Sequence, residues 1–361
     1  MAELDQLTAS TRRLIREDPA LIDAVFQSDP TVAYLRQNLR EDFDGGYRID
    51  EPLIYDGLVG GAYAKGKEFD ITEKQVEQNN QFTLRFSEVN VTLSLEDIRV
   101  INTGRQRAFS LVKSRMSTAF MTMGAHLALA VYMNGQRAGF TAMLNGLAEM
   151  VNDGTTASWD NNTYALYGTL TRNGTIGAAN NANVVNVNGA ITYNRLSTSY
   201  AAASYGSLTP NLGVTTPTGL VFIKNHFQPQ QRFETVEPNI GFRGVQFEGA
   251  TIIVSRYCPG SYLAASAGAA DPVAVTFMTQ SSNGALTAYP TLAVATSETL
   301  FWINARKPYL NFYVSRDALF GFGFTGFKWS AGNTKVAGQV LAGTQITGSP
   351  RYHAQLYGIT S

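Results

Sequence analysis

The sequence predicts an α+β fold in which one long helix lies among many short strands. A helical pattern runs without interruption from Asn102 to Gly135. Short alternating or wholly apolar segments, which are typical of strands, occur before this helix and through most of the second half of the chain. Charged residues make up only 16% of the 361 residues, against about 25% in typical soluble domains. A charge-poor surface favours association, so we expect other chains to cover much of this one.

Residues 1–50 carry the signals of short amphipathic helices. Asp18 and Asp29 each stand before a proline, which places a capping carboxylate next to a proline at the first helical position. Helices this short are marginal alone, so we expect them to lie on the body of the chain or on a neighbour. Apolar residues follow each pair at helical spacing: Leu21, Ile22, Val25 and Phe26, then Val32, Leu35 and Leu39.

Residues 51–97 change from a glycine-rich segment to alternating strands. Four glycines in the first part predict a flexible stretch. Apolar residues then alternate from Phe82 to Phe86, and after two polar residues the alternation resumes one position later at Val89. Because strand side chains have a period of two, this shift indicates a bulge or a change of packing partner. We expect a long β-hairpin whose tip and base contact different partners.

The long helix has signals at both ends. Asn102 or Thr103 can cap its start, and Asn134 with Gly135 supplies a left-handed stop. At about 1.5 Å per residue, roughly 29 helical residues span on the order of 43 Å. Apolar residues recur every three or four positions and form one stripe: Val112, Met116, Ala119, Phe120, Met123, Leu127, Ala130 and Val131.

The second half of this helix has no formal charge over about 20 residues, which is the length of a membrane-spanning helix. Polar and small residues interrupt the apolar character of that half, and we therefore expect a packing helix with no membrane contact. The interrupting residues are Ser117, Thr118, Thr122, Gly124 and His126.

Residues 136–220 contain few charges and are dominated by Asn, Thr, Gly, Ala and Tyr. This composition favours either disorder or short strands joined by turns. We expect strand structure between Val184 and Tyr193 and a short helix from Tyr200 to Leu208. Later in the chain we expect a helix or turn at Gln228–Phe233 and strands at Ala250–Val254, Leu300–Ile303, Tyr309–Val314, Val336–Leu341 and Tyr352–Ile359.

No pattern in the sequence indicates catalysis, a cofactor or a metal. Gly321, Gly323 and Gly326 match the spacing of the dinucleotide fingerprint, but phenylalanines interleave them and no acidic residue follows. We expect an aromatic loop or strand edge there. The three histidines lack metal-ligand spacing, and the single cysteine, Cys258, is expected to be a buried apolar residue. Basic and acidic residues are equal at 28 each, which argues against a free-standing nucleic-acid binder. The sequence predicts a non-enzymatic protein that assembles with copies of itself.

Three stretches, taken in order, resemble a known family. The first runs from Phe86 through the long helix to Leu147, the second is Ile240–Ala250, and the third begins at Leu310–Arg316 and continues to the end of the chain. They resemble the major capsid protein of tailed double-stranded DNA bacteriophages, the Hong Kong 97 type fold. The resemblance implies an N-terminal arm, an extended β-hairpin loop, a peripheral domain with a long spine helix, and an axial domain with a mixed sheet.

The resemblance also implies how the chain is divided. Residues 1–50 would be the arm and 51–97 the extended loop. The peripheral domain would comprise 98–140 and 305–350, and the axial domain 141–304 and 351–361, with a helical part at Trp159–Asn173.

Particular residues acquire expected roles through the same resemblance. Some relatives crosslink a lysine of the loop to an asparagine of a neighbour, although lysines in an exposed loop are usually only solvated. The candidates for contact between subunits are Lys65, Lys67, Lys74, Phe82 and Phe86. The structural spine would be formed by Met116, Phe120, Met123 and Leu127.

The function implied is a shell of hexamers and pentamers around the double-stranded DNA genome of a phage. Such a subunit would be part of the virion capsid, assembled in the host bacterial cytoplasm, with a scaffolding protein, a portal and a possible decoration protein as partners. Contact with DNA would be non-specific and weak, through scattered Arg and Lys side chains on the inner face. Candidates facing the interior are Arg12, Arg13, Arg16, Arg105, Arg107 and Lys113, for which an ordinary solvated or intersubunit role is equally open.

Other classes of protein fit the sequence less well. A tail-tube or decoration subunit is the main alternative, but those proteins are mostly compact β-folds and the long helix disfavours them. The content of Asn, Thr, Gly and Tyr would suit an extracellular adhesin, but charged residues interrupt any secretory signal at the N-terminus.

Overall fold

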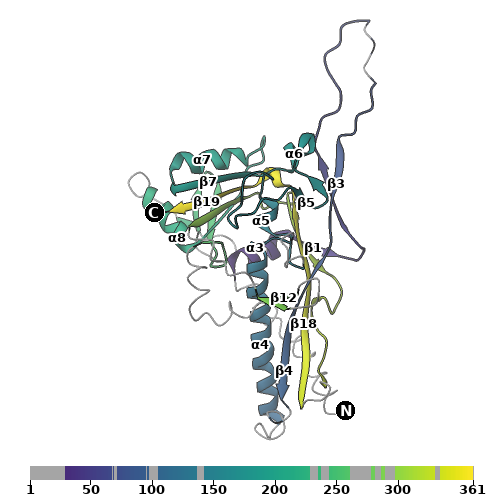
Figure 1. Ribbon diagram of the computed structural model, residues 1–361, viewed down its shortest axis with the longest axis vertical. Helices are drawn as coiled ribbons and strands as arrows, with labels where there is room; N and C mark the ends of the chain where they lie inside the picture. The colour runs from purple at the N-terminus through teal and green to yellow at the C-terminus, as the bar shows by residue number, and fades with distance from the viewer. Residues whose placement is uncertain are drawn as a thin grey trace.

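The computed structural model describes residues 29–66, 68, 71–94, 96, 105–135, 142–227, 235–236, 244–260, 278–280, 286–288, 297–329 and 334–360. Its main parts are two β-sheets, one long helix and a protruding hairpin (Figure 1). This mixture of helix and sheet confirms the predicted α+β class.

The first sheet has six strands among the described residues and is organised around β18 (Lys335–Gly348). Four strands pair with β18 in antiparallel fashion, and β1 joins the edge by parallel pairing with β15. The long strand therefore joins a segment that precedes the long helix to segments near the end of the chain. The other strands are β1 (Arg40–Phe43), β4 (Arg85–Ser94), β15 (Leu310–Ser315), β16 (Gly321–Phe324) and β17 (Lys328–Trp329).

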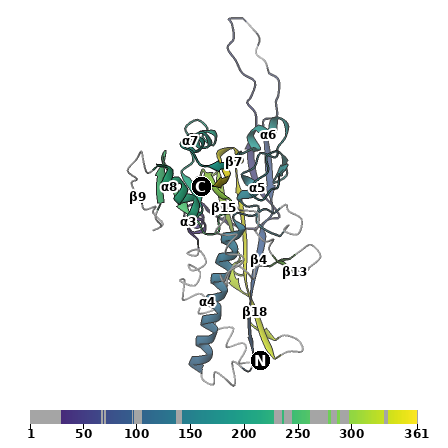
Figure 2. The same ribbon diagram turned by 60° about the vertical axis from the view of Figure 1, so that its left-hand side comes forward.

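The long helix α4 (Arg105–Ala130) lies beside β4 and β18 in the elongated lower part of the molecule (Figures 1 and 2). Its predicted apolar stripe faces the sheet, where Val91 and Leu93 of β4 join the same core. A fully buried side chain of this size contributes on the order of 2 kcal/mol to stability. The four residues expected to form the spine are all at most 1% exposed: Met116, Phe120, Met123 and Leu127.

The predicted left-handed stop of this helix is wrong. The helix ends at Ala130, and neither Asn134 nor Gly135 has a positive φ. The Asn134 side chain instead donates to Asp160 at 2.9 Å, and the Gly135 amide donates to Glu149 at 3.2 Å. Because both acceptors come from the segment that follows, tertiary contacts fix this end of the helix. The predicted caps at residues 102 and 103 lie outside the described residues.

The second sheet has seven strands in the part of the chain that is described, ordered β7-β19-β14-β8-β11-β10-β9. Helix α7 (Tyr193–Ala202) packs on β7 and β19, and α8 (Pro217–Phe227) packs against β14. The strands are β7 (Asn183–Ala190), β8 (Leu212–Thr215), β9 (Thr235–Val236), β10 (Gly244–Phe247), β11 (Ala250–Val254), β14 (Glu298–Ile303) and β19 (Ala354–Thr360).

Two helices expected in this half of the chain are misplaced. The segment Trp159–Asn173 is not helical: it holds the small hairpin of β5 (Leu166–Tyr167) and β6 (Leu170–Thr171), followed by α6 (Gly174–Asn180). The helix expected from Tyr200 to Leu208 starts earlier, as α7, because the Thr192 side chain caps it by accepting from the Arg195 amide. The helix or turn expected at 228–233 lies outside the described residues.

Helix α3 (Pro30–Leu39) confirms the predicted cap at Asp29, whose carboxylate accepts from the amides of Thr31 and Val32. Its apolar face is buried in the main core, so this helix lies on the body of its own chain. The other expected cap, Asp18, lies outside the described residues. Apart from the protruding hairpin, the remaining described elements are α5 (Leu147–Met150), the 3-10 turn η2 (Pro350–Tyr352) and the hairpin of β12 (Met278–Gln280) and β13 (Leu286–Ala288).

Candidate assembly surfaces

A hairpin of β2 (Ile49–Ile54) and β3 (Glu77–Phe82) carries the most prominent projection of the molecule (Figures 1 and 2). Large apolar side chains on the loop between the strands face solvent: Leu58 is 76% exposed and Ile71 is 92% exposed. Tyr63 and Val59 on the same loop are also exposed. Exposed apolar groups concentrated on one projection mark a surface that another molecule covers.

Polar contacts stiffen this loop near its strands. The Lys74 ammonium lies 2.7 Å from the Asp56 carboxylate, and the Tyr55 hydroxyl donates to the Gln75 carbonyl at 2.8 Å. The hydrogen bond from Lys74 lowers the pKa of Asp56. Of the three lysines expected to contact a neighbour, Lys74 thus has a partner within its own chain. Lys65 is exposed, and the third, at position 67, lies outside the described residues.

The prediction that Phe82 contacts a neighbouring subunit is wrong. Phe82 is only 3% exposed and meets the Tyr167 ring edge-on at 5.0 Å between centroids. The backbone at Gly168 passes so close that a Cβ there would lie 3.1 Å from the Phe82 ring. This aromatic side chain therefore anchors the base of the hairpin to its own chain.

The chain changes its packing partner between the end of β3 at Phe82 and the start of β4 at Arg85. Strand β3 pairs with β2, whereas β4 leaves the hairpin and pairs with β18. The Gln345 side chain fixes this transition, because its amide nitrogen donates to the Thr83 carbonyl at 2.7 Å and to the Asn145 side chain at 2.8 Å. The bulge or change of partner predicted at Ser87 is therefore wrong: β4 pairs with β18 without a register shift from Arg85 to Ser94, and the change of partner lies before Arg85.

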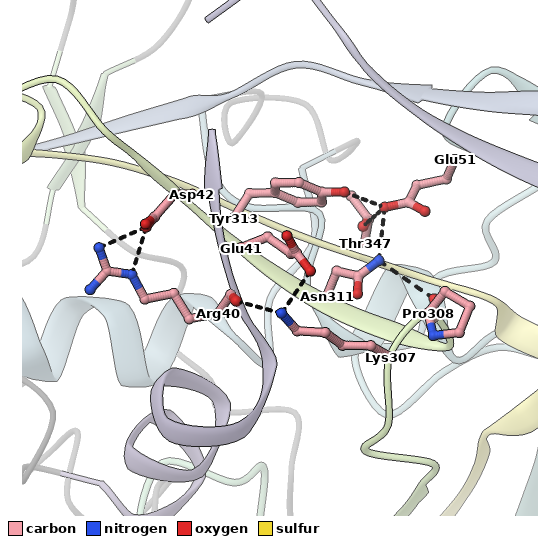
Figure 3. A network of polar contacts seen from close by, with 9 residues as sticks. All are labelled: Arg40, Glu41, Asp42, Glu51, Lys307, Pro308, Asn311, Tyr313 and Thr347. Atoms are coloured by element: carbon pink, nitrogen blue, oxygen red, sulfur yellow. Dashed lines mark hydrogen bonds and ion pairs between the residues drawn. The ribbon is translucent and has the colours of Figure 1, made fainter. Parts of the chain in front are cut away.

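Alternate residues of the hairpin strands face the body of the chain. Ile49 and Leu53 of β2 are buried on this face, and Glu51 lies between them. Figure 3 shows three donors that converge on one oxygen of this carboxylate. The Asn311 amide and the Tyr313 hydroxyl each lie 3.0 Å from it, and the Thr347 hydroxyl lies 2.6 Å from it.

These three donors belong to the six-stranded sheet: Asn311 and Tyr313 lie on β15 and Thr347 on β18. All three are neutral groups, so no cation offsets the charge of Glu51 within this cluster. Burial and the nearby carboxylate raise the pKa of Tyr313, which stays a neutral donor. The carboxylate therefore joins the hairpin to two strands of the sheet through directional hydrogen bonds.

A second cluster attaches the N-terminal segment beside the hairpin. The Lys307 ammonium lies 2.6 Å from the Glu41 carboxylate and donates to the Arg40 carbonyl at 2.7 Å (Figure 3). Strand β1 then pairs with β15, and Arg316 forms an exposed ion pair with Asp44 at 2.7 Å. The segments before and within the hairpin are thus both fastened to β15.

The other candidate surfaces lie along the elongated part of the molecule. Phe86 is 59% exposed and meets Phe320 edge-on at 5.1 Å, so it stays available as a contact residue. Lys113 is exposed on α4. Arg105 and Arg107 begin this helix, but their side chains lie outside the described part of the chain, as do Arg12, Arg13 and Arg16 in full.

The histidine on α4 and the single cysteine both make their contacts within their own chain. The His126 ring lies 3.1 Å from the Ser87 hydroxyl, and burial lowers the pKa of this histidine to about 4. Cys258 is buried, as predicted, and burial raises the pKa of its thiol. Among the described residues there is no group of three or more side chains that could hold a metal ion. None of the helices that the structure describes is long and apolar enough to span a membrane.

Sequence reasoning missed Glu51, Glu149 and Arg172. Glu51 could have been noticed, because it is the one charge at the inward-facing positions of a strand whose neighbours on that face are Ile49 and Leu53. No local pattern distinguishes the fully buried Glu149 and Arg172 from surface charges.

Comparison of sequences gives no relatives: no family model and no curated protein matches the chain. Comparison of structures gives many similar chains. The capsid of cyanophage A-1(L) is 12% identical, with a TM-score of 0.60, and the match covers 92% of this chain and 93% of that one.

Two further structures give similar results. The holo-SrpI encapsulin from Synechococcus elongatus PCC 7942 is 10% identical, with a TM-score of 0.54 over 90% of this chain and 86% of that one. The capsid of an empty GTA particle is 10% identical, with a TM-score of 0.51 over 90% of this chain and 96% of that one. These identities are too low to indicate more than a shared fold, and that fold extends over nearly the whole chain.

Proposed function

We propose that this chain, which has the Hong Kong 97 type fold of phage capsids and encapsulins, is the major subunit of a closed protein shell. The observation that carries the proposal is the match over nine-tenths of both chains to the cyanophage capsid. The exposed apolar loop of the hairpin supports it, because such a loop requires a partner.

In this proposal the subunits form hexamers and pentamers through heterologous contacts, in which a patch on one copy meets a different patch on the next. The hairpin loop would lie on a neighbouring subunit, with Lys65, Phe86 and the exposed apolar residues as contacts. The range 1–50 would act as the arm, although its helix α3 is held by its own chain. The proposal keeps the ranges of the other domains as the resemblance implies them; β4, which falls within the range of the loop, pairs with β18 of the six-stranded sheet.

The cargo of the shell would be the double-stranded DNA genome of a phage. The support is electrostatic: from Ile98 to Ala148 the chain has no acidic residue, and every charge there is basic. Arg105, Arg107 and Lys113 would face the interior, together with Arg12, Arg13 and Arg16 of the arm. A virion made in the bacterial cytoplasm, with scaffolding, portal and decoration proteins as partners, completes this proposal.

A second candidate is a shell that encloses protein rather than DNA. The specific observation in its favour is the encapsulin match, whose TM-score of 0.54 is close to that of the phage capsid. A tail-tube or decoration subunit is disfavoured, because the match to the cyanophage capsid covers 92% of this chain.

Electron microscopy of the purified full-length protein tests the shell proposal. We expect closed or partial shells, or rings of five and six subunits, after expression alone or with its neighbouring genes. A protein that stays monomeric under all these conditions would contradict the proposal. Nuclease treatment of intact particles then separates the two cargoes, because protected DNA indicates a virion and its absence with enclosed protein indicates a compartment.

A further inference from the structure

The base of the hairpin combines two kinds of contact with the body of the chain. Ile49, Leu53 and Phe82 supply apolar packing, which is strong but non-directional. Glu51 supplies hydrogen bonds, which weaken steeply when their angles change. Apolar packing alone would hold the hairpin on the body, but it would allow the hairpin to tilt.

A charged side chain at position 51 also carries a cost in free energy. A carboxylate on an inward-facing strand surface loses part of its hydration, and a half-buried charge without partners is unfavourable. Here one carboxylate oxygen receives three donors from two strands, and none of these three described donors is a cation. A valine or threonine would fill the same position without this requirement. Retaining a charge there is therefore explained better by a need for one defined geometry than by stability.

We infer that Glu51, bound by Asn311, Tyr313 and Thr347, is a clamp that fixes the direction of the β2–β3 hairpin before subunits meet (Figure 3). The clamp is reinforced on the other hairpin strand by Gln345, which binds the Thr83 carbonyl next to β3. Gln345 and Thr347 stand two positions apart on β18, so one strand of the sheet contacts both sides of the hairpin base.

The consequence for assembly follows from preorganisation, and it rests on the proposed function as a shell subunit. A loop that already points in the binding direction loses less conformational entropy when it docks. A subunit without the clamp should fold, but its hairpin should tilt more freely and its two strands should separate more often. Assembly should then be slower, although the exposed apolar residues on the hairpin loop are unchanged.

The first measurement uses hydrogen exchange on the unassembled full-length subunit. Glu51→Ala should accelerate amide exchange in β2 and β3 roughly tenfold, while the strands of the seven-stranded sheet keep their protection. Thr347→Val, which removes one donor at nearly constant volume, should give a smaller acceleration in the same amides. The matched control is Asp50→Ala, which removes the same charge from the adjacent, outward-facing position of β2.

The second measurement follows assembly by light scattering for the same variants. Glu51→Ala and Thr347→Val should assemble several-fold to roughly tenfold more slowly than the wild type, and Asp50→Ala at the wild-type rate. Unchanged hairpin exchange in Glu51→Ala would overturn the clamp, even if assembly slowed. Faster exchange throughout both sheets would overturn it as well, because Glu51 would then be a general stability residue.

The two proposals fail in different ways. If the wild-type protein never assembled, the shell proposal would fail, but the exchange comparison between Glu51→Ala and Asp50→Ala would still decide the clamp. If the wild type assembled and the exchange patterns were equal, the shell proposal would stand and the clamp would fall.

Discussion

Helix α4 and the β2–β3 hairpin use apolar side chains in opposite ways. On α4 the apolar stripe is closed off by β4 and the sheet, so that Phe120 and Met123 have no exposed surface. On the hairpin loop Leu58 and Ile71 have almost nothing of their own chain to cover them. The difference separates residues whose burial stabilises the monomer from residues whose burial must await another molecule.

The largest effect should come from a charge placed in the buried stripe. Phe120→Asp removes a fully buried ring and leaves an unpaired carboxylate in an apolar core, so we expect the protein not to fold. Circular dichroism and solubility of the variant measure this. The control is Met121→Asp at the next position, which is 53% exposed and should fold normally. A folded Phe120→Asp protein would contradict the assignment of this face to the core.

The next largest effect concerns the buried Arg172, which joins the end of α5 to the segment before β7. Its guanidinium donates to the carbonyls of Glu149, Met150, Asn152 and Asn180, and burial lowers its pKa to about 10. Arg172→Met keeps the volume but leaves these carbonyls without their donor. The expected loss in the free energy of unfolding is about 4 kcal/mol.

Urea denaturation of Arg172→Met measures this loss. The matched control is Arg316→Met, which removes an exposed ion pair with Asp44 and should change stability by less than about 1 kcal/mol. Equal effects of the two substitutions would show that burial of the guanidinium carries no special weight.

Titration offers a third comparison, because the groups with large pKa shifts lie in the body. Burial lowers the pKa of His353 to about 4, with its ring accepting from the Asn304 amide and donating to the Tyr309 carbonyl. The pKa of His126 is lowered to about 4 in the same way. Between pH 6.5 and 4 the unfolded chain binds a proton at each histidine that the folded chain does not. The free energy of unfolding therefore falls as the pH falls.

Asp29 acts in the opposite direction over part of this range. Burial raises its pKa from 3.8 to about 6, so the folded chain holds a proton that the unfolded chain binds only at lower pH. The effect of the two histidines should exceed that of the aspartate, so the free energy of unfolding should fall by about 3 kcal/mol between pH 7 and 4. In His353→Gln the effects of His126 and Asp29 should nearly cancel, so the free energy of unfolding should depend little on pH in this range. Denaturation at several pH values measures both slopes, and an unchanged slope in the variant would contradict the assignment.

Local patterns predicted much of the body and little of what joins its parts. The stripe on α4 and the cap at Asp29 follow from spacing within one helix, and strands β11, β14 and β15 follow from short apolar runs. The end of α4 did not follow, because Asp160 and Glu149 fix it from outside the helix.

Phe82 shows the same limit at a candidate site. Its place in an alternating strand indicates that one face is buried, but alternation does not say whether the covering surface belongs to the same chain. The Tyr167 ring that covers it lies 85 positions later and belongs to a two-residue strand with no strong pattern. Glu51 was missed for the same reason, since its three donors come from residues 311–347.

The smallest effect on stability should be found on the hairpin loop, where the effect on assembly should be large. Leu58→Ser and Ile71→Ser remove apolar surface that the monomer leaves exposed, so the free energy of unfolding should change by less than about 0.5 kcal/mol. Leu53→Ser, at the buried base of the same hairpin, should lose about 2 kcal/mol. Thermal denaturation and light scattering of the three variants give stability and assembly separately. If the loop variants assembled as the wild type does, the exposed loop would not be a contact between subunits, and the contrast with α4 would reduce to one of exposure alone.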